Sequence, residues 1–246
     1  MSITHLMQKQ STCLLPTDQA LLTNIFGAYK TIYISPDGSE YPSFPRVEHS
    51  CLHTFFNEYE ERYKSFISFM KVIPQFGRLS MVDKKHLIQN QYIETIILNN
   101  QMISKFITGV LVNSVNNVYD SASGNKSNQA MARLIVYMHD PLLLKLLIII
   151  QTFSSGFKRY RNNLPVEWVY DDSLGIFAAQ NTYVEVLWRY LLSRLPSERD
   201  TVKFFNQLIL DLLYLQDAAF AVERYVRNVP HEVHQMNALT QSLWFV

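Results

Sequence analysis

The sequence predicts an all-α fold in one large domain, and three observations support this prediction. Only seven glycines and nine prolines occur in 246 residues, so the residues that end short strands are scarce. Apolar residues make up 48% of the chain, which is enough to bury a sizeable core. Long segments repeat their apolar residues at the three- and four-residue spacing of amphipathic helices. We therefore expect packed long helices throughout.

Charge and hydropathy narrow the range of functions. The formal net charge is +1, so no basic surface is expected to bind DNA or anionic lipid directly. The N-terminus, MSITHLMQKQ, lacks the apolar core of a signal peptide. The most apolar run, residues 142–150, contains Lys145 and is too short to span a bilayer. We interpret the chain as intracellular, without a membrane contact.

The first predicted helix begins near Thr17, which can cap it, and ends near Lys30. Asp18 favours the positive end of its dipole. The stretch SPDGSEYPSFP, residues 35–45, concentrates proline, glycine and serine and predicts a loop. Residues 1–12 are expected to be an extension, and residues 13–246 the domain.

A long helix with an unusually aromatic face is predicted from about residue 47 to residue 72. Pro74 breaks its pattern, which resumes after Asp83 as KKHLIQNQYIETIIL. A softer helical segment ends near Tyr119. The sequence SASGNKSN, residues 121–128, is polar and predicts a mobile loop after that segment.

Three strong helices are predicted in the second half. The first follows His139-Asp140-Pro141 and is apolar nearly all round, so it should lie centrally between other helices. The second runs from about Leu174 to Leu195 and ends at a proline. The third, about residues 200–228, is apolar on more than one face, which is typical of a helix with a partner in another subunit. The last residues, ALTQSLWFV, predict a short amphipathic helix.

The stretch around Pro74 resembles the signature of the nuclear receptor ligand-binding domain. At the matching spacings, without a gap, stand Lys71, Ile73, Pro74, Phe76, Leu79, Asp83, Leu87, Ile88 and Glu94. Gln75, Lys84 and Gln89 depart from the usual residues of that signature. Other stretches resemble the first, eighth, ninth and tenth helices of the family, so the resemblance covers almost the whole chain.

This resemblance implies a three-layer antiparallel helical sandwich with a lipophilic pocket. On the pocket wall it places Phe55, Phe56, Tyr59, Arg62, Ile93, Ile96 and Ile103. Ile103 stands where several receptors for lipid acids and steroids have an arginine, so Arg62 is the candidate anchor for a carboxylate ligand. Two alternatives stay open: the aromatic side chains can fill the pocket themselves, and Arg62 can belong to a solvated helix face beside Glu58.

The resemblance also implies a groove that binds the short LxxLL helix of a coregulator. Lys71 would cap the last carbonyl groups of that helix. The residues assigned to the groove are Lys71, Phe76, Leu87, Ile88, Gln89, Leu239, Ser242 and Leu243. In the family a glutamate of the final helix caps the opposite end, and Ser242 replaces it here, so a weaker cap without charge is expected.

The tenth helix of the family implies a dimer surface. The residues assigned to it are Leu208, Leu212, Leu215, Ala219 and Val222. The expected partner is a second copy or a retinoid X receptor-like protein. The ion pair that joins the eighth and tenth helices in the family is absent on both sides, since Leu143 and Gln216 occupy its positions; losing both charges costs less than stranding one.

Two functions follow from this resemblance. The first is a ligand-sensing or orphan domain of the nucleus that regulates transcription through a lipophilic ligand and LxxLL coregulators. The alternative is a ligand-independent dimerisation or coregulator-binding protein whose pocket is filled by its own side chains. No nucleophile, base and orienting group can be assembled from the sequence, so no enzyme is expected.

Two further motifs are interpreted as structural. His49 and His53 lie one helical turn apart, a spacing compatible with zinc, but Cys51 is expected on a different face, so no metal or other cofactor is predicted. Residues 143–147, LLKLL, match the coregulator motif itself, yet their apolar flanks predict burial in the core.

Overall fold

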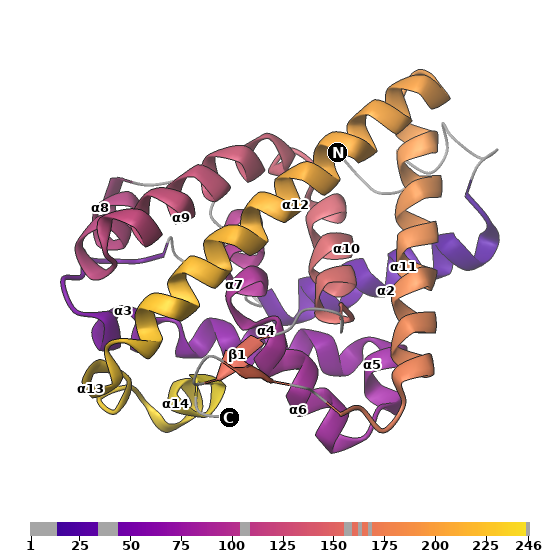
Figure 1. Ribbon diagram of the computed structural model, residues 1–246. Coiled ribbons are helices and arrows are strands. Elements are labelled where there is room, and N and C mark those ends of the chain that lie inside the picture. Colours follow the sequence, from indigo (N-terminus) through magenta and orange to yellow (C-terminus); the bar gives the residue numbers. More distant parts are fainter. Residues whose placement is uncertain are drawn as a thin grey trace.

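We describe a computed structural model over residues 14–33, 44–103, 109–154, 159–161, 164–166 and 169–244. Helices dominate these residues, which confirms the all-α class (Figure 1). One short antiparallel hairpin was not predicted; it pairs β1 (Arg159–Arg161) with β2 (Leu164–Val166). The predicted extension, residues 1–12, and most of the predicted loop at 35–45 lie outside the described residues.

The first half of the described chain follows the predicted helical segments. Its helices are α2 (Pro16–Tyr33), α3 (Leu52–Glu58), α4 (Glu60–Val72), α5 (Pro74–Arg78), α6 (Met81–Asn90) and α7 (Tyr92–Ile103). The long aromatic helix is therefore two helices, α3 and α4, which meet at Tyr59.

The break at Pro74 has a local explanation. Pro74 occupies the first turn of α5, where its missing amide hydrogen is not needed. Ile73 before it is extended, with φ −72° and ψ 117°. The Lys84 ammonium donates to the Gly77 carbonyl at 2.8 Å, so the residue that departs from the family pattern supports the end of α5.

The second half contains longer helices. They are α8 (Gly109–Val118), α9 (Ser121–Leu134), the 3-10 turn η1 (Ile135–Tyr137), α10 (Pro141–Thr152), α11 (Ser173–Arg194), α12 (Glu198–Arg227), α13 (Pro230–Val233) and α14 (Ala238–Trp244). The three strong helices of the sequence thus correspond to α10, α11 and α12, each with its predicted bounds met within a few residues.

The loop predicted for SASGNKSN is wrong, because these residues form the first half of α9. Asp120 caps this helix by accepting from the Ser123 amide at 2.7 Å. Ser123, Gly124 and Ser127 are buried, and the Ser123 hydroxyl donates to the Ala221 carbonyl of α12 at 3.1 Å. Ser123 therefore packs against α12, and Gly124 faces α8, where an added Cβ would lie 3.4 Å from the Val115 carbonyl oxygen, so these small residues serve helix packing and not a loop.

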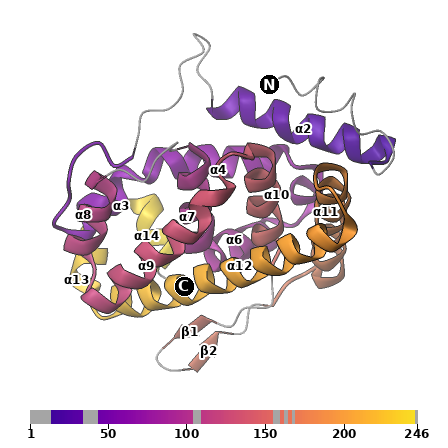
Figure 2. The same ribbon diagram turned by 90° about the horizontal axis from the view of Figure 1, so that it is seen from above.

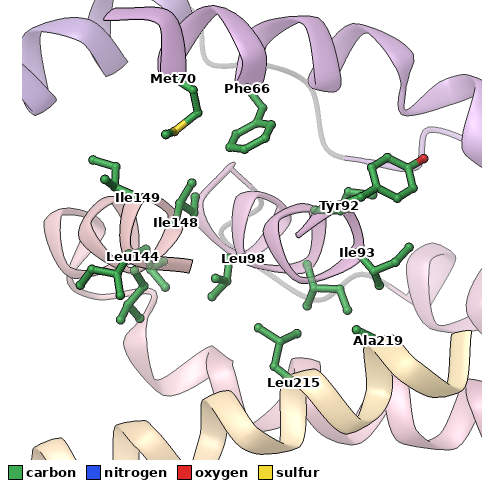
Figure 3. Close-up of a cluster of buried hydrophobic side chains, with 14 of the residues drawn as sticks. Phe66, Met70, Tyr92, Ile93, Leu98, Leu144, Ile148, Ile149, Leu215 and Ala219 are labelled. Carbon is green, nitrogen blue, oxygen red and sulfur yellow. The ribbon is translucent and has the colours of Figure 1, made fainter. Parts of the chain in front are cut away.

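The core has α7 and α10 at its centre. Figure 3 shows α4 on one side of this pair and α12 on the other, with Phe66 and Met70 above Ile148 and Leu98, and Leu215 below. Ten consecutive residues of α10, 143–152, are buried, as the sequence predicted for a central helix. Residues 143–147, the formal LxxLL motif, are at most 1% exposed and so belong to the core.

Helix α2 lies along one face of the molecule, beside α4 and α10 (Figure 2). The Arg189 guanidinium of α11 donates to both Asp18 oxygens, at 2.7 and 2.8 Å. This hydrogen-bonded pair holds the pKa of Asp18 below its usual value. Asp18, predicted as a dipole partner, is therefore also an anchor between α2 and α11. Within the described residues, no helix is both long and apolar enough to cross a bilayer.

Candidate functional site

An aromatic cluster occupies the region where α3, α4, α7 and α14 meet. Tyr63 stacks on Tyr92, with ring centroids 4.5 Å apart and planes inclined by 16°. Trp244 of the final helix meets Phe56 edge-on at 5.2 Å and Tyr92 at 5.1 Å. Edge-on and stacked contacts of this kind add to the stabilisation from apolar burial. The cluster therefore joins the end of the chain to the helices that carry the predicted pocket.

Among the described residues, the predicted pocket wall borders two small cavities. One cavity of about 30 Å³ is lined by Phe55, Phe56, Tyr59, Ile93 and Ile96, together with residues of α8, α9 and α12. A second, of about 10 Å³, is lined by Tyr59, Arg62, Ile96 and their neighbours. Such volumes hold one to about three water molecules, whereas drug-sized ligands occupy pockets of hundreds of Å³. The structure thus groups six of the seven predicted pocket residues around space that side chains have largely filled.

Two pocket predictions need separate comment. Arg62 is 7% exposed and its guanidinium carbon lies 5.0 Å from the centre of the Phe44 ring, so the alternative of a solvated helix face is wrong. Glu58 instead accepts from the Arg46 amide and pairs with His49. Ile103 is the last residue of α7, and its side chain lies outside the described residues.

The residues assigned to the coregulator groove divide into two groups. Phe76, Leu87, Ile88, Gln89 and Leu243 are all buried, at most 8% exposed. Lys71 and Ser242 are exposed, and Leu239 is half-buried. The Ser242 hydroxyl donates to the Leu239 carbonyl of its own helix at 2.6 Å. Surface apolar side chains near Lys71 in the chain are instead Val72, Met81 and Val82.

The residues assigned to the dimer surface are mostly core residues. Leu208, Leu215, Ala219 and Val222 are at most 3% exposed, and Leu212 is half-buried against the same core. These four side chains are therefore unavailable to a second subunit in this structure. The exposed apolar side chains of α12 are others: Val202, Ile209, Leu210, Leu213, Tyr214 and Phe220.

The C-terminal segment is fixed to α3 and α4 by a row of polar contacts that we call the C-terminal latch. His53 Nδ1 lies 2.6 Å from Glu232 Oε2 of α13. The Asn237 amide donates to Asn57 Oδ1 at 2.7 Å, and the Asn237 side chain donates to Glu60 Oε2 at 2.6 Å. Residues 53, 57 and 60 follow the spacing of one helix face. Figure 1 shows α13 and α14 beside α3 at the lower end of α12.

Apolar burial and one further hydrogen bond complete this attachment. Val233, Met236 and Leu243 are at most 4% exposed. The Gln89 side chain of α6 donates through Nε2 to the Ser242 carbonyl at 2.6 Å, which satisfies one of the orphan carbonyls at the end of α14. Gln89, a departure from the family pattern, thus caps the final helix of its own chain.

One group of potential metal ligands was missed by the sequence interpretation. Cys51, His53 and Glu232 each offer a donor atom within 4.8 Å of the other two, and it is the only such group among the described residues. Cys51 and His53 were considered in the sequence, but Glu232 lies 179 positions from His53, a separation that no local spacing reveals. His49 takes no part, because its ring pairs with Thr54 and Glu58.

Comparison with known proteins adds no assignment to this geometry. No model of a protein family matches the chain, and no curated protein matches its sequence significantly.

Proposed function

We propose that this chain is a nuclear receptor ligand-binding-like domain that acts without a small ligand, through contacts with other proteins. The observation that carries the proposal is the filled pocket, in which Trp244 of the final helix packs on Phe56 and Tyr92. The residue pattern around Pro74 and the all-α arrangement support membership of that family. The assignment to its three-layer sandwich, and a role in regulating transcription in the nucleus, belong to the same proposal.

Cavity volume favours the ligand-independent function over the ligand-sensing one. A lipophilic ligand of ordinary size would have to displace several rings that are now buried, such as Phe55 and Phe56, each at most 2% exposed. Exposing or moving these rings costs free energy that ligand contacts would have to offset. In a domain with this pocket, the protein's own side chains, and not a ligand, stabilise the final helix.

The C-terminal latch supports the same conclusion. In a ligand-operated domain the ligand shifts the final helix between two positions. Here α14 is held by the latch, by Gln89 and by Trp244, all of them groups of the chain itself. We therefore expect one dominant position of α14 in the purified protein.

A stripe on α12 is the surface that we propose for a second copy of the chain. Successive residues are rotated by about 100° around a helix axis. One sector of α12, about 40° wide, therefore contains Val202, Ile209, Leu213 and Phe220. They are 39–52% exposed. A two-fold axis across this stripe would pair it with itself, and a straight apolar stripe is typical of helix pairing between subunits.

Native mass spectrometry of the full chain, before and after denaturation, tests both the absence of a bound ligand and the formation of a dimer. We expect a dimer without a co-purified lipophilic molecule, and no rise in melting temperature when fatty acids, sterols or retinoids are added. A stoichiometric adduct released on denaturation would replace our proposal by the ligand-sensing function.

A double variant tests whether the α12 stripe forms the dimer interface, as distinct from any effect of adding charge to the surface. Ile209→Asp with Leu213→Asp should convert the dimer to a monomer in analytical ultracentrifugation while the helical circular dichroism is kept. Val47→Asp is the matched control, since Val47 is 60% exposed and lies outside α12. A dimer that persists in the double variant would exclude the stripe, and a wild-type monomer would point to a different protein as the partner.

A further inference from the structure

A cysteine, a histidine and a glutamate converge where α13 meets the start of α3. His53 Nδ1 lies 2.6 Å from Glu232 Oε2, and the His53 amide donates to the same oxygen at 3.2 Å. The Cys51 sulfur lies within 4.8 Å of a ring nitrogen of His53 and of a carboxylate oxygen of Glu232. The side chains of His53 and Glu232 are 23% and 22% exposed, so an ion from solvent can reach them.

The position of Cys51 is not explained by the helix that it precedes. Cys51 is the N-cap residue of α3, with φ −120° and ψ 138°, yet it makes no side-chain hydrogen bond to the helix. Serine, threonine, aspartate and asparagine are preferred at this position because their oxygen accepts from an amide. A thiol that does not cap, and that lies beside an imidazole and a carboxylate, is placed as a ligand would be.

We propose that Cys51, His53 and Glu232 bind a zinc ion. Thiolate sulfur, imidazole nitrogen and carboxylate oxygen are the three donor types that zinc takes in proteins, and thiolate disfavours magnesium and calcium. Three protein ligands leave the fourth tetrahedral position to a water molecule. The imidazole nitrogen that binds the ion is Nδ1, the atom that now faces Glu232.

The site needs only local movement to reach coordination geometry. Around a tetrahedral zinc ion with bonds of about 2.0–2.3 Å, donor atoms lie about 3.3–3.6 Å apart. The His53–Glu232 contact must therefore open from 2.6 Å by less than about 1 Å. The sulfur lies within 4.8 Å of the other donor atoms and must approach each of them by at most about 1.5 Å.

The ion would connect parts of the chain that are far apart in sequence. Two ligands come from the start of α3 and one from α13, next to the latch contacts of Asn57 and Glu60. Zinc would therefore fasten the C-terminal segment to α3 and restrict its opening. This inference does not depend on the proposed function, because metal binding can be measured whether or not the chain regulates transcription.

The competing explanation is a hydrogen bond between His53 and Glu232 alone, with Cys51 nearby for packing. Binding of cobalt(II) distinguishes the metal site from the hydrogen bond alone, because a cobalt thiolate has a charge-transfer band that a cobalt–imidazole–carboxylate site lacks. The reduced full-length chain, stripped with a chelator, is titrated with cobalt(II) and then with zinc(II), which displaces cobalt and removes the band.

We expect one cobalt ion per chain, a thiolate band and tetrahedral d–d bands. Cys51→Ser should abolish the thiolate band and weaken zinc binding at least about tenfold. Glu232→Gln keeps a hydrogen-bond acceptor for His53 and should weaken zinc binding to a similar extent, so a loss of folding does not explain the effect. Circular dichroism without metal checks that each variant is folded.

Two control variants fix the assignment. Cys13→Ser removes the other cysteine of the chain, and His231→Ala removes the exposed histidine next to Glu232; neither should change the band or the affinity. Absence of a thiolate band in the wild type, or unchanged zinc affinity in Cys51→Ser, would overturn the proposal.

Discussion

Helix α10 and the aromatic cluster are two halves of one core that are packed in different ways. Residues 143–150 of α10 are almost entirely leucine and isoleucine and are at most 9% exposed, and neither of the two cavities is lined by an α10 residue. Tyr59 lines both cavities; Phe55 and Phe56 line the larger one, and Tyr63 lines the smaller one. We infer that side-chain packing is less complete around the aromatic cluster than around α10.

The comparison indicates a division of roles. The aliphatic half supplies a rigid centre on which α7, α11 and α2 pack. The aromatic half contacts the final helix through Trp244, so small changes in its packing can be transmitted to α14. Substitutions in the two halves should therefore differ in size and in what they move.

The largest effect is expected from a truncation in the aliphatic half. Leu147→Ala removes a side chain that is 1% exposed and should destabilise the domain by about 4 kcal/mol, since close-packed neighbours relax only partly into the cavity. Urea denaturation monitored by circular dichroism measures this loss. A loss below about 2 kcal/mol would show that the α10 region collapses easily, and the proposed contrast would fail.

A smaller but more local effect is expected at the end of the chain. Trp244→Ala should cost about 2 kcal/mol, less than a fully buried tryptophan because this ring is partly exposed. Amide hydrogen exchange of α14 should rise more than that of α10. Trp188→Ala is the matched control, since Trp188 packs on Phe205 of α12 and not on α14. Equal exchange in α14 for both variants would show that Trp244 does not hold the helix.

Lys145 is the polar exception within the aliphatic half, and it predicts a pH dependence. The residue is 1% exposed, and its ammonium donates to the Pro141 carbonyl at 3.2 Å and lies 3.9 Å from the centre of the Tyr29 ring. Burial lowers the pKa of Lys145 to about 8, although Asp140 acts in the opposite direction. In the unfolded chain the pKa of lysine is about 10.4.

The sign of the effect follows from proton binding. Between pH 8 and 9.5 the unfolded chain holds more protons at this residue than the folded chain, so stability rises with pH, by about 1.5 kcal/mol over that range. The window ends there because burial raises the pKa of Tyr183 and Tyr190 in the folded state, which reverses the trend near pH 10. In Lys145→Met the rise between pH 8 and 9.5 should be absent, and an unchanged pH profile would disprove the assignment.

The sequence predicted much of the fold because its signals are local. Pro74 and Pro141 mark helix starts, Asp140 caps α10, and the apolar spacing of α11 and α12 persists over many turns. The loop prediction at 121–128 failed because Ser123 serves there in helix packing against α12 and Gly124 in packing against α8. That role depends on which helix lies opposite, which residue composition does not show.

The candidate site was less predictable because it depends on contacts across the whole chain. The structure brings six of the pocket residues predicted from the resemblance around two small cavities, but the ring packing beside them includes Trp244, far away in sequence. The assignment of α12 residues to a dimer surface met a similar difficulty. Helix α12 is apolar on more than one face, and the spacing of its apolar residues does not show which face packs against the core. Glu232 could be joined to Cys51 and His53 only by the position of α13.

The smallest effect tests the cavities themselves. Val115 lines the cavity of about 30 Å³, so Val115→Ile adds one methylene group to empty space and should stabilise the domain by up to about 0.8 kcal/mol. Val186 of α11 is 2% exposed and lines neither cavity; Val186→Ile should therefore destabilise by about 1 kcal/mol through overpacking. The sign difference between these matched substitutions, measured from denaturation midpoints, is the direct test. Destabilisation by both would mean that the aromatic half is as tightly packed as α10, and that its rings leave no room to adjust around the final helix.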